Sequence, residues 1–143
     1  MIAIGCDHGG YDLKLFLEKH LDEKGIAYKD LGCDSTDSVD YPEYGRAVAK
    51  AVADGSCEKG IVICSTGIGI SIAANKVPGI RAALCTNTMM ARLTREHNDA
   101  NVLALGGYIV GPQLASEIMD TFLSTDFSGG ERHVRRVGKI ENV

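Results

Sequence analysis

The hydrophobic and polar positions of the chain follow two alternating patterns. Short apolar runs occur at residues 1–5, 27–31, 60–64, 81–85 and 101–105. Between them, apolar residues recur every three or four positions, as Leu13, Leu17 and Leu21 do. The runs predict buried strands, and the stretches with the longer period predict helices over residues 11–23, 40–53, 69–78, 88–96 and 112–123. A last helix is predicted to begin near Glu131.

Residues that favour turns and caps mark the ends of these elements. Gly25 ends the first helix, and Gly129-Gly130 interrupt the chain before the last one. Asp40 is the predicted N-cap of the second helix, because Pro42 lies in the first turn and Glu43 follows three residues after the cap.

Strand and helix alternate along the chain, which predicts an α/β fold. We expect residues 1–143 to form a single domain with a five-stranded parallel sheet, helices on both faces and right-handed crossovers, a Rossmann-like three-layer arrangement. The last helix is basic and has no strand after it. We expect this helix to pack on a partner subunit, so the sequence predicts a homodimer.

The composition disfavours several classes of protein. With 45% hydrophobic residues, the 143-residue chain is globular rather than disordered. A net charge of −4 argues against bulk attraction to nucleic acid, and no apolar run approaches the length of a membrane span. Five cysteines, an odd number without C-x-x-C spacing, argue against a disulfide framework and a zinc site. We therefore expect a cytoplasmic protein with no metal site, no nucleic-acid partner and no membrane contact.

Polar and glycine residues follow the first strand directly, in the order Asp7, His8, Gly9 and Gly10. In open parallel sheets, ligands bind at the carboxyl ends of the strands. A carboxylate and an imidazole in this position can hold sugar hydroxyls or a phosphate. Asp7 can instead cap the next helix through an Asx-type turn, with His8 merely exposed. We favour the binding role because these residues lie at the carboxyl end of a strand.

Cys64 ends the third apolar run and precedes a turn at residues 65–69. A free cysteine often only fills space in a core. Two features favour a chemical role for Cys64. Its thiol lies at a strand end, and the N-terminus of the helix that follows favours the thiolate form. The backbone N–H groups of the turn are suited to hold an anion. Ile72 stands where the third glycine of G-x-G-x-x-G would fall, which disfavours a dinucleotide site.

Further candidates come from the second half of the chain. His97 ends the fourth helix, where it can act as an acid or base or simply cap the helix end. Arg132 and Arg136 share a helix face and fit a phosphate, although a charge run is more often a solvated face. His8 completes a phosphate grip if this helix folds over the cleft or reaches a partner's cleft. We expect His97 and the arginines to face the same cleft as Cys64.

The chain also carries a series of longer motifs: G-C-D-H-G-G, D-Y-P-E-Y, I-C-S-T-G-I-G-I-S-I-A-A-N-K, G-I-R-A, R-E-H-N-D-A-N-V-L-A-L-G and a late G-G-x-R-H with a second arginine. Together they closely resemble the ribose-5-phosphate isomerase B family, which includes galactose-6-phosphate isomerase subunits. The resemblance implies interconversion of an aldose phosphate and a ketose phosphate without metal or cofactor. It also implies a homodimer, in some members paired into a tetramer, with active sites built from both chains.

The resemblance implies a role for each candidate residue. Cys64 is the base that moves a proton between C2 and C1, and Thr66 and His97 assist ring opening, with His97 as the acid. The residues placed around the substrate are Asp7, His8, Ser65, Gly67, Ile68, Gly69, Ile70, Ser71, Asn98, Arg132 and Arg136. In this set the aspartate contacts the sugar, and the histidine and arginines hold the phosphate. The amides of residues 67–71, with the asparagine nearby, stabilise the enediolate.

Two positions depart from the usual pattern of the family, and a third differs from another branch of it. Ser65 stands where the loop usually has glycine, so it adds a hydroxyl near the substrate or stiffens the loop. Tyr108 stands where many members have an arginine that reaches a phosphate, which leaves more of that role to the last helix. In another branch a glutamate serves as base at the position of Ile70, so here Cys64 keeps that role.

The sequence therefore predicts the isomerisation of ribose 5-phosphate to ribulose 5-phosphate, a step of the pentose phosphate pathway. One alternative is an isomerase of a six-carbon aldose or aldose phosphate, such as galactose 6-phosphate, allose 6-phosphate or free allose. Another is a non-catalytic sensor of sugar phosphates or nucleotides on the same fold. A nicotinamide-dependent enzyme is disfavoured because its fingerprint is missing.

Overall fold

A five-stranded parallel sheet lies at the centre of the molecule. The computed structural model describes residues 1–143, and the strands are β1 (Ile2–Cys6), β2 (Tyr28–Asp30), β3 (Lys59–Cys64), β4 (Ala82–Leu84) and β5 (Val102–Gly106). They are ordered β2-β1-β3-β5-β4, and every neighbouring pair is parallel. The predicted α/β fold with a parallel sheet is therefore confirmed.

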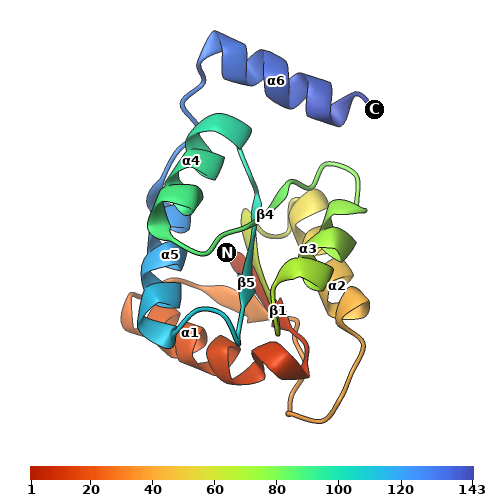
Figure 1. Cartoon of the computed structure of the whole chain (residues 1–143), viewed down its shortest axis with the longest axis vertical. Coiled ribbons are helices and arrows are strands. Elements are labelled where there is room, and N and C mark those ends of the chain that lie inside the picture. The colour runs from red at the N-terminus through yellow and green to blue at the C-terminus, as the bar shows by residue number, and fades with distance from the viewer.

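The chain forms six α-helices. They are α1 (Tyr11–Glu23), α2 (Tyr41–Ala53), α3 (Ile68–Asn75), α4 (Thr88–Asn98), α5 (Pro112–Ser124) and α6 (Glu131–Glu141). Helices α1, α4 and α5 lie on one face of the sheet, and α2 and α3 lie on the other (Figure 1). Each helix was predicted from the sequence, whereas the short 3-10 turn η1 (His8–Gly10) between β1 and α1 was not.

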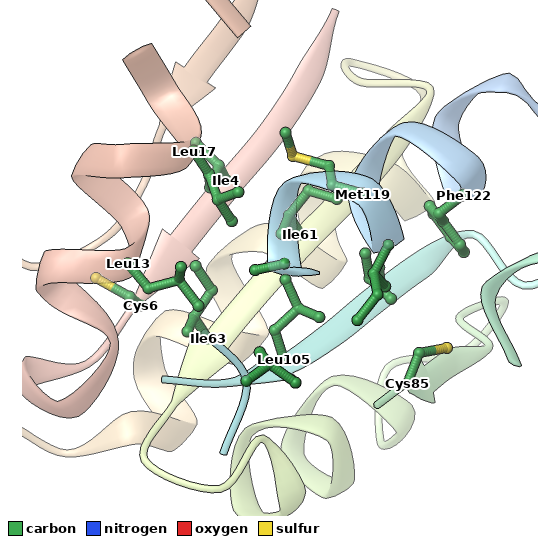
Figure 2. Packing of buried hydrophobic residues seen from close by; sticks show 14 of the residues in the cluster. Ile4, Cys6, Leu13, Leu17, Ile61, Ile63, Cys85, Leu105, Met119 and Phe122 are labelled. Carbon is green, nitrogen blue, oxygen red and sulfur yellow. The ribbon is translucent and has the colours of Figure 1, made fainter. Parts of the chain in front are cut away.

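The alternation of side chains along β3 separates two hydrophobic cores. Ile61 and Ile63 belong to the core under α1 and α5, and Val62 and Cys64 belong to the core under α2 and α3. Figure 2 shows the first core, in which helix side chains such as Phe122 pack on the strands. Burying a side chain of this size contributes roughly 1.5–3 kcal/mol. This alternation therefore places the Cys64 side chain on the face of the sheet that α3 covers.

Helix α6 stands apart from these layers. In Figure 1 it crosses one end of the molecule, whereas the start of α1 lies at the opposite end. His133 is the only buried residue of α6, so apolar packing holds this helix weakly. None of the helices combines the length and the apolar composition that a membrane span requires.

The predicted cap of α2 is only partly right. Asp40 does occupy the N-cap position, with Pro42 in the first turn, but its side chain makes no capping hydrogen bond. Glu43 still lies in the first turn, where a negative charge favours the helix dipole. The sequence located the helix start correctly and assigned the wrong contact to it.

A buried ionic cluster fastens α1 to the chain that follows β2. The Lys14 side chain is 2% exposed, and its Nζ donates to both carboxylate oxygens of Asp30 (3.0 and 2.8 Å) and to the carbonyl of Cys33 (2.8 Å). Glu18 Oε1 lies 3.9 Å from the same Nζ and is buried without a hydrogen bond. Burial, reinforced by the charge of Asp30, raises the pKa of Glu18 to about 7.

We predict that Glu18→Gln changes how stability depends on pH. In the folded wild type Glu18 keeps its proton up to about pH 7, whereas the unfolded chain releases it near the ordinary value of 4.5. The folded state therefore binds more protons between these values, and its free energy of unfolding falls as the pH rises through this window. Relative to wild type, Glu18→Gln should gain roughly 1–3 kcal/mol between pH 5 and pH 8.

Urea unfolding at several pH values measures this difference directly. Glu23→Gln, the same substitution at an exposed position of α1, is the matched control and should follow the wild-type pH curve. Parallel curves for Glu18→Gln and wild type would show that Glu18 is ionised in the folded protein at neutral pH.

Candidate active site

Cys64 lies at the carboxyl end of β3, between the ends of β1 and β5. Its register partner in β5 is Gly106, and the N–H of Gly107 donates to its carbonyl (2.8 Å). The residue is 5% exposed, and its Sγ accepts a hydrogen bond from the N–H of Gly67 (3.1 Å). The thiol is thus held under the turn that leads into α3.

Gly67 shapes that turn and is the N-cap of α3. Its φ of +79° lies in the left-handed region, which side chains other than glycine adopt at a cost. A Cβ at this position would also lie 2.8 Å from the carbonyl carbon of Leu105 and 3.0 Å from the nitrogen of Gly106. Glycine is therefore required both by the backbone conformation and by the close approach of β5.

The free N–H donors at the start of α3 are fewer than the sequence suggested. Thr66 Oγ1 accepts the N–H of Ile68 (3.2 Å), and the N–H of Ser71 closes the first helical turn. The Ser71 hydroxyl also stays within the helix, because it donates to the carbonyl of Ile68 (2.7 Å). The N–H groups of Gly69 and Ile70 have no partner in the chain. Of the amides of residues 67–71, only these two are therefore free to bind an anion.

Asp7 and His8 lie beside this turn, at the end of β1. Asp7 is buried, and its Oδ1 accepts the N–H groups of Gly9 (2.9 Å) and Gly10 (3.2 Å), so the capping role considered for it is present. Its Oδ2 makes no hydrogen bond and stays available. His8 Nδ1 accepts the N–H of Val39 (3.1 Å), so the neutral ring carries its proton on Nε2 as a donor.

The structure explains how Ser65 is accommodated. A Cβ on Gly9 would lie 3.0 Å from the Ser65 nitrogen and closer still to its Oγ, so the serine side chain fills space that Gly9 leaves empty. Ser65 Oγ makes no hydrogen bond within the chain, and its carbonyl accepts the N–H of Tyr108 (2.9 Å). Tyr108 is 75% exposed at this same edge of the sheet.

His97 and Asn98 do not lie at this edge. Helix α4 runs antiparallel to the strands, so its last residues return to the amino end of the sheet, just before β5 begins at Val102. Strand β5 runs from Val102, near the end of α4, to Gly106, which lies beside Cys64. Its length alone separates the two ends of the sheet by roughly 13 Å. Within one chain the structure therefore does not bring His97 and Cys64 into one cleft.

Arg132 and Arg136 belong with His97 rather than with Cys64. Both are exposed on α6, and α6 does not fold over the Cys64 edge of its own chain (Figure 1). A pocket of about 540 Å³ lies at the start of α6, lined by Ser128, Gly130, Glu131, Arg132, His133 and Arg135. The predicted residues thus form two groups, at opposite ends of one sheet.

His133 is a member of the second group that sequence reasoning missed. Its ring stacks on that of His97, with 4.4 Å between centroids and 7° between planes. Burial, together with the neighbouring His97, Arg132 and Arg136, lowers the pKa of His133. The signal in the sequence was its spacing from Val137, since the two residues mark the one face of α6 that is not charged.

Other residues bear on what the site can hold. The ring of Tyr41, at the start of α2, lies close to Gly69, because a Cβ on Gly69 would be 2.7 Å from it. Tyr41 therefore lies beside one of the free N–H groups. No group of three or more His, Cys, Asp or Glu side chains is arranged to hold a metal ion. The available chemistry is a thiol, a carboxylate, N–H donors and an imidazole at one end. At the other end there are two imidazoles and three guanidinium groups that make no ion pair within the chain.

Comparison with known proteins places this geometry in context. Residues 2–140 match the family model described as Ribose/Galactose Isomerase. Ribose-5-phosphate isomerase B of Escherichia coli is 50% identical over 142 residues, covering 99% of this chain and 95% of that protein. D-erythrulose-4-phosphate isomerase of Pectobacterium atrosepticum is 42% identical over 144 residues, with the same coverage. The structure of Clostridium thermocellum ribose-5-phosphate isomerase B superposes with a TM-score of 0.96 at 59% identity, covering 99% and 95% of the two chains.

We predict that Gly9 and Ser65 are energetically coupled. Gly9→Ala places a methyl group against the Ser65 side chain and should destabilise the protein by about 1–3 kcal/mol. Ser65→Gly removes the nearest atom and should restore about 1 kcal/mol or more of that loss in the double variant. Urea unfolding of the wild type, the two single variants and the double variant gives the coupling energy.

Gly138→Ala serves as the control, because a Cβ there meets no atom within 4 Å. It should leave stability unchanged or slightly raise it, since alanine favours a helix. Strictly additive effects of Gly9→Ala and Ser65→Gly would mean that the two residues do not share this space.

Proposed function

The chain belongs to the ribose/galactose isomerase family, and from this premise we propose that it interconverts ribose 5-phosphate and ribulose 5-phosphate through an enediolate. As a member of this family it is an aldose–ketose isomerase. One observation carries the proposal: the Cys64 thiol lies under the start of α3, where two backbone N–H groups have no partner.

This arrangement supplies a base and an oxyanion site for the proton transfer. The Cys64 thiolate takes the proton from C2 while the electron pair forms a C1–C2 double bond and the oxygen on C1 becomes an oxyanion. The N–H groups of Gly69 and Ile70 stabilise that oxygen, and one such donor contributes about 3–4 kcal/mol to lowering a barrier of this kind. The Cys64 thiol then gives the proton to C1, while the hydroxyl on C2 passes its own proton to the oxygen on C1. This leaves a carbonyl at C2 and gives the ketose.

We propose that the complete active site is composite, formed by two chains of a homodimer. The Cys64 edge of one chain offers His8 for the phosphate, and the α6 helix of the partner offers Arg132 and Arg136. Two features support this: neither arginine has an ion-pair partner within its own chain, and Ile68 (51% exposed) leaves an apolar surface beside the Cys64 turn. A phosphate held between two guanidinium groups gains charge-assisted hydrogen bonds from both chains.

In the composite site His97 is the acid for ring opening, with Thr66 beside the sugar. The ring of His133, whose pKa is lowered by burial and by the neighbouring charges, is stacked on the ring of His97. Asp7, through its free Oδ2, contacts a sugar hydroxyl. Asn98 lies next to His97 and faces the enediolate from the same side.

The length of the sugar is the finer part of the proposal. A five-carbon phosphate is favoured because two of the compared proteins are named for ribose 5-phosphate, and a four-carbon phosphate is the second candidate because a relative is named for it.

We also propose a cytoplasmic location, in line with five free cysteines.

The test is the turnover of ribose 5-phosphate by the purified protein with EDTA present. We expect ribulose 5-phosphate to form at a rate that EDTA does not change, with a kcat/KM above those for four- and six-carbon aldose phosphates. Cys64→Ala should lower kcat by about 10²–10⁴-fold, because it removes the general base. Ligand-induced thermal stabilisation without turnover would favour a sensor instead, and full turnover by Cys64→Ala would remove the thiol from its role.

A further inference from the structure

Asp99 has the most unusual backbone in the chain. It is the only non-glycine residue with a positive φ (φ 47°, ψ 42°), and it follows His97 and Asn98 directly at the end of α4. A left-handed conformation outside glycine is unfavourable and persists where surrounding contacts hold it. The contacts that hold Asp99 therefore indicate what the conformation is for.

Two arginines converge on this residue. Arg95 donates from NH1 to Asp99 Oδ1 (2.9 Å), and the Arg95 side chain is 8% exposed. Arg81 donates to the Asp99 carbonyl from both NH2 (2.8 Å) and Nε (3.2 Å), and its NH2 lies 3.7 Å from Oδ2. The carboxylate and the carbonyl of Asp99 are thus both bound by buried or half-buried guanidinium groups.

Each arginine also contacts a second segment, one before α6 and one at its end. Arg95 Nε donates to the carbonyl of Thr125, in the segment that enters α6 (2.9 Å). Arg81 NH1 pairs with Glu141, the last residue of α6. The contacts that hold the end of α4 therefore also hold the last residue of α6 directly, and they hold the end of α5, from which the chain leads into α6.

Helix α6 has few apolar contacts, so polar links carry much of its attachment. Arg81 holds Glu141 at its end, and before its start the Ser128 hydroxyl donates to the carbonyl of Glu96 (2.8 Å). His133 is its only buried residue, and Val134 and Ile140 are 53% and 51% exposed. A helix held in this way has an orientation set mainly by its end contacts.

We propose that Asp99 is a positioning residue that fixes α6 relative to the end of α4. Through Arg81 and Arg95 it keeps Arg132 and Arg136 at a constant distance from His97, so that one end of the chain grips a phosphate as a unit. This inference rests on the proposed function, in which α6 supplies the phosphate grip.

Three substitutions separate the backbone of Asp99 from its carboxylate. Asp99→Asn keeps a residue that tolerates the left-handed region and removes the charge, and Asp99→Gly keeps the conformation and removes the whole side chain. Asp99→Ala removes the carboxylate and also introduces a residue that adopts the left-handed region only at a cost. We expect KM for ribose 5-phosphate and the inhibition constant of inorganic phosphate to rise about threefold to tenfold in the first two variants and further in the third.

The division between KM and kcat distinguishes positioning from simple stability. A loss of folded protein lowers the apparent kcat and leaves KM unchanged, whereas a loosened phosphate grip raises KM and leaves kcat of the folded enzyme within about twofold. Arg92→Ala is the matched control, since it removes an exposed ion pair with Glu96 on the same helix and should leave KM unchanged.

Hydrogen exchange of the α6 amides provides a reading that does not depend on turnover. Asp99→Ala should speed exchange at residues 134–139 by about tenfold while exchange in β1 and β3 stays as in wild type. If wild type does not turn over ribose 5-phosphate, the proposed function fails and this measurement alone decides the inference. Should Asp99→Ala not fold, Asp99→Asn and Asp99→Gly carry the same test. Unchanged KM, or unchanged α6 exchange, would overturn the positioning role.

Discussion

The parallel sheet imposes one direction on every strand, and this constraint governs where chemistry can occur. Loops that follow strands gather at one end of the sheet, and the last residues of antiparallel helices return to the other. Cys64 follows a strand, and His97 ends a helix, so the two cannot meet within one chain. An isomerase that needs both must draw the second from another chain, and the homodimer we propose is thus a consequence of topology rather than an addition to it.

At the strand end, local geometry decides which groups are free to react. Gly67 brings its backbone close to β5 in a conformation that suits glycine, and in doing so it directs its own N–H at the Cys64 sulfur. The next donors along, at Gly69 and Ile70, are then left without acceptors. The base and the oxyanion site that we propose therefore lie together, because one glycine turn joins the strand to the helix. The same edge holds His8 in a defined tautomer through Val39, so the group that we propose for the phosphate is oriented by a neighbouring loop.

Much of this could be predicted from the sequence, and the reasons for the remainder are physical. Periodicity predicted every strand and helix because side-chain direction repeats with a fixed period in each. It placed Cys64 at a strand end for the same reason. The distribution of individual N–H groups, the absent cap at Asp40 and the fit of Ser65 above Gly9 depend on distances of a few tenths of an ångström between distant segments. The stacking of His133 on His97 depends on how α6 docks, which no local pattern encodes.

The central claim is that one active site contains Cys64 of one chain and His97 of another. It is tested most directly by mixing two inactive variants, Cys64→Ala and His97→Gln, after unfolding and refolding them together. In a mixed dimer one site carries both substitutions and the other carries neither. Random assembly in equal amounts should therefore restore about a quarter of wild-type activity. If each chain held a complete site, every site in the mixture would carry one substitution, and activity no higher than that of the separate variants would contradict the account.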